Sequence, residues 1–142
     1  MIIREAKIVY NEVGEIEAEK LDDPEKIVAY MKGAFDEYPE QESFWVIGLD
    51  QKNKLKFRQM VTLGGISQCL IDVRLIFKPL LMASCSAFVV CHNHPSGETN
   101  PSSADIKITR EIKEAAKIMK MEFLDHIIIG DDFYSFQNSV MF

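Results

Sequence analysis

Hydrophobic and polar positions along the chain follow the two periods that distinguish strands from helices. Ile108, Ile112, Ala116 and Met119 recur at helical spacing and predict an amphipathic helix over 103–120. Strands are predicted where apolar residues run together or alternate with polar ones, over 2–10, 43–50, 55–63, 86–92, 123–129 and 133–136. Because these strands are interspersed with helices, we expect an α/β sandwich on a mixed sheet.

Local signals predict where two further helices begin. Asp22-Asp23-Pro24 combines a capping side chain with proline at the first helical position, which favours a helix over 24–35. Asp72 can cap a helix over 73–84, which Pro79 would kink or divide. The turn-rich segment 51–54 separates two predicted strands, so we expect them to pair as a hairpin.

The size and charge of the chain limit what it can be. Its 142 residues, 47% hydrophobic and 27% charged, suit one globular domain over 1–142 with a real core. A net charge of −6 argues against a dedicated, sequence-independent DNA binder. No apolar run reaches the roughly 18 residues of a membrane span, and the first residues lack the pattern of a secretory signal, so we expect a cytoplasmic protein.

The cysteine content is typical of a reduced protein. Cys69, Cys85 and Cys91 are an odd number without C-x-x-C spacing. We therefore expect free and mostly buried thiols rather than a disulfide framework.

Candidate chemistry gathers around two of the three histidines. His92 and His94 lie two residues apart at a predicted strand end, so their rings project to the same side, and the Pro- and Gly-containing loop 93–101 follows. Asp105 lies three residues before Ile108, on the core-facing side of its helix. Two imidazoles and one carboxylate form a typical catalytic zinc shell with a fourth position for water. The spacing therefore predicts one zinc ion per chain.

A second interpretation of the same residues stays open. His92 and His94 could be ordinary loop histidines, and Ser102-Ser103-Ala104-Asp105 has the pattern of a capping box. The two interpretations are compatible. Ser102 can accept from a helix N–H while its own hydrogen points to an activated water or an oxyanion.

The same residues carry a family resemblance. His92-Asn93-His94, Ser102 and Asp105 match without a gap the H-x-H-x₇-S-x₂-D signature of JAMM metallopeptidases, also called JAB or MPN+ domains. The wider strings 92–97 and 125–130 resemble the bacterial RadC-like branch, and the resemblance covers 23–142. It implies an MPN/JAB-like αβα sandwich with cytidine-deaminase-like layering. It also implies zinc-dependent hydrolysis of an amide or isopeptide bond in an unidentified protein or peptide.

The resemblance also implies roles for single residues. A JAMM glutamate that precedes an aromatic-rich strand holds the activated water and carries its proton, and Glu42 occupies that position, with Glu40 as the reserve. The alternative for Glu42 is a solvated residue before a strand. Ser102 would stabilise the oxyanion or act only as a helix cap, and His126 would orient the ligands or be structural. Arg74 lies in a string similar to the family's, which implies a surface or substrate-side role.

Two other signals are weaker. Cys91 alternates away from His92 on its strand, so it is not expected to bind the metal, and the P-C-x-x-C string of zinc deaminases is absent from the sequence. Lys54, Lys56 and Arg58 share parity with Lys52 and are expected on one strand face, with Leu55 and Phe57 on the other. That face is either a small nucleic-acid footprint or an edge protected by charge.

An alternative function also stays open. RadC-like proteins have the family label DNA repair, and the chain could be a non-catalytic zinc-containing accessory protein in DNA repair or recombination complexes. Longer RadC-like chains carry an N-terminal helix-hairpin-helix region, which we do not expect here because the first predicted helix begins at 24, so the support for DNA binding is weak. Exposed Met and Phe residues near the C-terminus are compatible with a homodimer.

Overall fold

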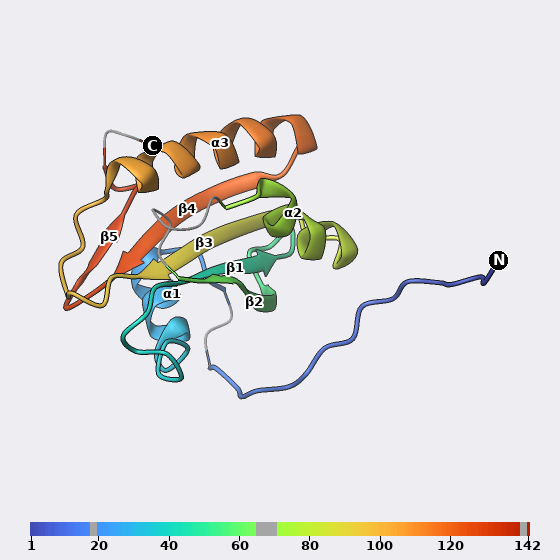
Figure 1. Cartoon of the computed structure of the whole chain (residues 1–142), viewed down its shortest axis with the longest axis horizontal. Coiled ribbons are helices and arrows are strands. Elements are labelled where there is room, and N and C mark those ends of the chain that lie inside the picture. Colours follow the sequence, from blue (N-terminus) through green and yellow to red (C-terminus); the bar gives the residue numbers. More distant parts are fainter. Residues whose placement is uncertain (18–19, 65–70, 140–141) are drawn as a thin grey trace.

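The computed structural model describes residues 1–17, 20–64, 71–139 and 142 (Figure 1). Its helices are α1 (Pro24–Met31), α2 (Val73–Met82) and α3 (Ser103–Met119). Its strands are β1 (Ser43–Leu49), β2 (Leu55–Leu63), β3 (Ala87–Asn93), β4 (Glu122–Ile129) and β5 (Phe133–Ser135). The strands form one sheet in the order β2-β1-β3-β4-β5, in which β3 and β4 are parallel and the other pairs antiparallel. Among the described residues, no helix is both long and apolar enough to cross a membrane.

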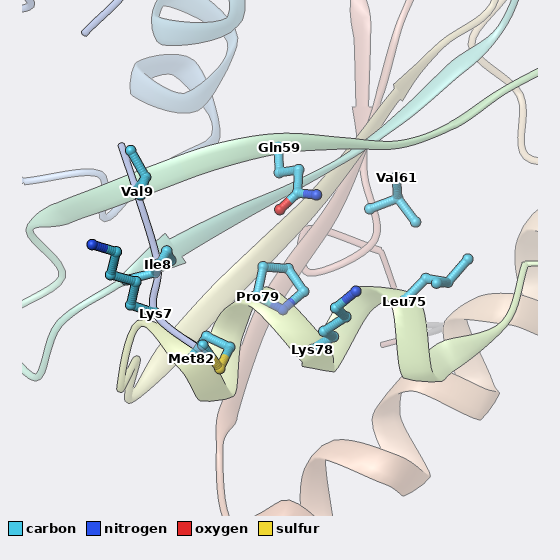
Figure 2. Close-up of a pocket in the computed structure, with 9 residues that line it drawn as sticks. All are labelled: Lys7, Ile8, Val9, Gln59, Val61, Leu75, Lys78, Pro79 and Met82. Carbon is cyan, nitrogen blue, oxygen red and sulfur yellow. The ribbon is translucent and has the colours of Figure 1, made fainter. Parts of the chain in front are cut away.

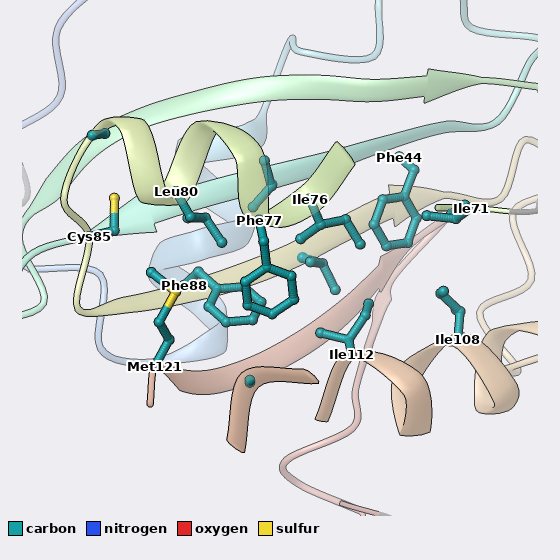
Figure 3. Close-up of a cluster of buried hydrophobic side chains, with 14 residues drawn as sticks. Phe44, Ile71, Ile76, Phe77, Leu80, Cys85, Phe88, Ile108, Ile112 and Met121 are labelled. Atoms are coloured by element: carbon teal, nitrogen blue, oxygen red, sulfur yellow. The ribbon is translucent and has the colours of Figure 1, made fainter. Parts of the chain in front are cut away.

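The sheet separates two apolar clusters, which confirms the predicted α/β sandwich. The α2/α3 cluster fills one face and includes Ile76 and Leu80 of α2, Phe88 of β3 and Ile112 of α3 (Figure 3). The α1 cluster fills the other face and includes Ile27 and Met31 with Ile47, Val89 and Ile127 of the sheet. Every residue of β3 is buried, as expected of a strand covered on both faces.

The helices begin where the capping residues predict. The Asp23 side chain accepts from the Lys26 N–H, and the Asp72 side chain accepts from the Arg74 N–H. The helix α1 ends at Met31, four residues earlier than predicted, and the chain then continues as turns. Pro79 lies inside α2 without dividing it.

The predicted strand over 2–10 is wrong. Residues 1–17 have no regular structure, and within the described part of the chain the segment pairs with no strand. Ile8 packs against the α2/α3 cluster, and residues 7–9 line a groove between β2 and α2 (Figure 2). The alternating pattern thus allows one side chain, that of Ile8, to pack against the rest of the protein. A strand also needs a neighbouring strand to which its backbone can hydrogen-bond, and the pattern does not show whether one is available.

The predicted common face of the basic residues on β2 is also wrong, because β2 carries a bulge. Gly48 pairs with Phe57 and Leu49 with Leu55, so Lys56 is an extra residue. Leu55 therefore packs in the α1 cluster and Phe57 in the α2/α3 cluster. Beyond the bulge the side chains of β2 alternate in a shifted phase. Lys56 Nζ donates to the Ala83 carbonyl at the end of α2 (2.6 Å), whereas Arg58 Nη1 donates to the Tyr30 carbonyl of α1 (3.2 Å).

Candidate metal centre

The end of β3 and the start of α3 bring three metal-ligating side chains together. His92 Nε2 lies 3.1 Å from His94 Nε2 and 3.2 Å from Asp105 Oδ1, and His94 Nε2 lies 3.2 Å from Asp105 Oδ2. Each residue offers one ligand atom, and these atoms all lie within 4.8 Å of one another. The three residues that the spacing predicted thus form one cluster that could hold a metal ion.

Backbone contacts between two loops fix the position of His94. The His94 N–H donates to the Ile129 carbonyl (2.8 Å), which continues the pairing of β3 with β4. The His94 carbonyl accepts from Gly97, whose own carbonyl accepts from the Asp131 N–H (2.8 Å). Gly130 permits this approach, because a Cβ there would lie 2.3 Å from the Gly97 oxygen. The loops after β3 and β4 therefore hold each other in place beside the ligands.

Asp105 serves the helix start and the cluster at once. It is 1% exposed, and its Oδ2 accepts from the Ser102 N–H (2.8 Å) while its own N–H donates to Ser102 Oγ (3.0 Å). The predicted capping box is confirmed, and it holds the carboxylate in the orientation that faces the imidazoles. Burial raises the pKa of Asp105, but its interactions with a protonated His92 and with the Ser102 N–H outweigh this and keep the pKa below its ordinary value. The carboxylate is therefore ionised at neutral pH.

The contacts of His94 show which of its nitrogens is available. Its Nδ1 lies 2.8 Å from the main-chain carbonyl of Glu98. A carbonyl oxygen only accepts, so Nδ1 carries the hydrogen, and in the neutral ring Nε2 presents a lone pair. Nε2 faces a carboxylate and a second imidazole, so the three groups could hold a metal ion between them. The side chain of His94 is 13% exposed, so solvent reaches the cluster from this side.

His126 lies behind the cluster, on β4. Its Nε2 is 2.8 Å from His92 Nδ1, its Nδ1 is 2.7 Å from Thr109 Oγ1, and its ring stacks on Phe136 with centroids 4.8 Å apart. It is fully buried, and burial lowers its pKa well below the ordinary value, so the ring stays neutral. Sequence reasoning selected His126 but missed Thr109. Thr109 could have been found from its position four residues after Asp105, which puts the two residues on the same face of α3.

The candidate base, Glu42, lies directly before β1. Phe44 of β1 pairs with His92 of β3, and Glu42 lies two residues before Phe44 along the chain. The side chain of Asn93 holds this segment, because its Oδ1 accepts from the Ser43 N–H (2.7 Å) and its Nδ2 donates to the Gln41 carbonyl (3.0 Å). Sequence reasoning assigned no role to Asn93.

The exposure of the two candidate glutamates differs. Glu42 is partly buried, whereas the reserve candidate Glu40 is exposed and lies in the turns before β1. Glu42 is therefore the less exposed of the two and the nearer to β1 in the chain.

The remaining candidates have contacts elsewhere. Arg74 is exposed at the start of α2 and pairs with Asp72 (2.7 Å), and Lys54 is exposed before β2. Cys91 belongs to the α1 cluster, and burial raises its pKa so that it remains a thiol. Cys85 and Cys91 are free and buried as predicted, and Cys69 lies outside the described residues.

Comparison with known proteins places this chain in a family. The family model described as RadC-like JAB domain matches residues 21–141. The UPF0758 protein of Flavobacterium johnsoniae is 42% identical over 113 residues, which are 79% of this chain and 49% of the relative. A UPF0758 protein of Clostridium perfringens is 44% identical over 92 residues, 65% of this chain and 40% of the relative.

The fold is that of a JAB domain, and the chain belongs to the RadC-like JAB domain family. It spans about half the length of the curated relatives that it matches. A UPF0758 protein of Chlorobium chlorochromatii is 38% identical to this chain, and the match covers 78% of this chain and 50% of the relative.

Proposed function

We propose that the domain is a zinc-dependent hydrolase that cleaves an amide or isopeptide bond in a protein or peptide. The observation that carries the proposal is the convergence of two imidazole nitrogens and one ionised carboxylate on a point that solvent reaches beside His94. Catalytic zinc sites take this set of three donors and leave the fourth position open. The residues present therefore fit the metal that the family resemblance implies.

The donor set also helps to select the metal. Two nitrogens and one oxygen are a poor match for Ca²⁺ or Mg²⁺, which take oxygen ligands. The same set does suit Fe(II). The family resemblance favours zinc, which would supply Lewis-acid chemistry that makes water a nucleophile near neutral pH.

Glu42 is the group that would handle protons. Glu42 directly precedes β1, and the register of β1 on β3, continued by two residues, would bring it beside His94; its carboxylate would then take a proton from water and pass it to the leaving amine. Asn93 would keep that carboxylate in place through its two hydrogen bonds to the Glu42 neighbours.

Ser102 would stabilise negative charge on the substrate oxygen. Its oxygen accepts from the Asp105 N–H, so its hydroxyl hydrogen is available as a donor. Loss of one such donor in an oxyanion site costs about 2.7–4 kcal/mol of transition-state stabilisation.

The test compares three variants for metal content and for cleavage of peptide and isopeptide-linked libraries. Glu42→Gln should keep zinc and lose cleavage, because it retains the shape of the side chain and loses the proton acceptor. His94→Ala should lose both zinc and cleavage. Glu40→Gln is the matched control and should keep both, since Glu40 is exposed in the turns.

Two results would overturn parts of the proposal. Full turnover by Glu42→Gln would show that Glu42 is not the base. A wild type that holds zinc and cleaves no member of the libraries would favour the non-catalytic accessory role in DNA repair or recombination complexes.

A further inference from the structure

His92 and two buried side chains behind the His-His-Asp cluster form a chain of hydrogen bonds that ends on the backbone of α3. His92 Nδ1 lies 2.8 Å from His126 Nε2, and His126 Nδ1 lies 2.7 Å from Thr109 Oγ1. The Thr109 hydroxyl donates to the main-chain carbonyl of Asp105 (2.7 Å). Both histidines are fully buried and Thr109 is 4% exposed, so these contacts are shielded from water.

The direction of this chain is fixed at the Thr109 end. The Asp105 carbonyl can only accept, so it takes the one hydroxyl hydrogen of Thr109. His126 Nδ1 must then donate to the Thr109 oxygen, and Nε2 of the neutral His126 ring is left as an acceptor. His92 must therefore donate from Nδ1, and it presents a lone pair at Nε2, the atom that faces Asp105 and His94.

We infer that Thr109 and His126 are positioning residues that set the tautomer of His92 for metal binding. The inference rests on the metal site of the proposed function. If the chain of hydrogen bonds ran the other way, His92 Nε2 would carry a proton and could not bind a metal. Asp105 contributes twice, because its carboxylate belongs to the cluster and its carbonyl anchors the far end of the chain. Such groups behind a ligand are worth about 10–100-fold in metal affinity.

The first test reads the tautomer directly. With uniform ¹⁵N labelling of histidine, long-range ¹H–¹⁵N spectra of the wild-type protein at neutral pH distinguish the two ring nitrogens, and the chain has only three histidines. The inference predicts His126 protonated at Nδ1 and unprotonated at Nε2, in both the metal-free and the zinc-loaded protein. A His126 ring protonated at Nε2 would reverse the chain and overturn the inference.

The second test measures zinc affinity by competition with a chromophoric chelator. Thr109→Val keeps the shape of the side chain and removes the acceptor for His126, so zinc should bind at least about 10-fold more weakly. Thr109→Ser keeps the hydroxyl and should restore affinity close to that of the wild type. Equal zinc affinity of Thr109→Val and the wild type would overturn the inference.

Neither test depends on catalysis. A wild-type protein that binds zinc and shows the predicted tautomer but cleaves nothing would contradict the proposed function and leave the role of Thr109 intact. Tight zinc binding by Thr109→Val, alongside cleavage by the wild type, would contradict only the role of Thr109.

Discussion

Asn93 holds the start of β1 against the end of β3, so its truncation should destabilise the fold by a predictable amount. Asn93→Ala removes the acceptor of the Ser43 N–H and the donor to the Gln41 carbonyl. Ser43 is 3% exposed, so its N–H loses its partner inside the protein at a cost of about 1–3 kcal/mol. Gln41 is exposed, and its carbonyl can bind water instead. The expected loss in the free energy of unfolding is therefore about 2 kcal/mol.

Urea unfolding measures this loss. With a slope of about 2 kcal/mol per molar urea, the midpoint should fall by about 1 M. The control is Asn11→Ala, which truncates an exposed asparagine in the extended N-terminal segment and should change stability by less than about 0.5 kcal/mol. Equal midpoints for the two variants would refute the role assigned to Asn93. If Glu42 is the base, Asn93→Ala should also slow hydrolysis while zinc content is retained.

Three further predictions concern the scaffold. Gly130→Ala would place a Cβ 2.3 Å from the Gly97 carbonyl oxygen, so it should lower the free energy of unfolding by about 1–3 kcal/mol, measured by thermal unfolding. The control Gly14→Ala has nothing within 4 Å of its added Cβ and should leave the stability unchanged. Arg58→Met removes a guanidinium that lies over two aromatic rings, at 5.1 and 5.6 Å from their centroids, and should cost about 1–2 kcal/mol in urea unfolding; an unchanged midpoint would contradict this. Burial raises the pKa of Asp125 above its value in the unfolded chain, where it ionises at about pH 4. The folded chain therefore binds more protons than the unfolded chain above that pH. The free energy of unfolding of the wild type, relative to that of Asp125→Asn, should fall as the pH rises from about 4 to the folded pKa and then level off. A relative stability that rises with pH would contradict the raised pKa.

The parts of the fold that depend on local signals could be predicted from the sequence. Ser102 caps α3 as its spacing from Asp105 indicates, and the apolar run of β3 is buried on both faces. His92, His94 and Asp105 meet because a strand end and a helix start impose the positions of their side chains. These predictions needed only the geometry of single elements and one short loop.

The parts that failed depend on partners distant in sequence. The pattern of residues 2–10 suits a strand, but whether a sheet edge receives them is decided by tertiary packing. The bulge at Lys56 shifts the phase of β2, and nothing in the alternation of that strand reveals it. The contacts of Thr109 with His126 and of Asn93 with Ser43 escaped notice for the same reason, because these residues lie 17 and 50 positions apart in the sequence.

The most direct test of the central claim is the zinc stoichiometry of the purified, untagged protein, measured by elemental mass spectrometry beside Asp105→Asn. The variant keeps an oxygen that can accept from the Ser102 N–H and removes the negative charge that faces the two imidazoles. We predict close to one zinc ion per wild-type chain and a sharply lower content in the variant. A wild type without zinc that could not be reloaded with it would contradict the claim and reduce the three residues to loop and capping roles.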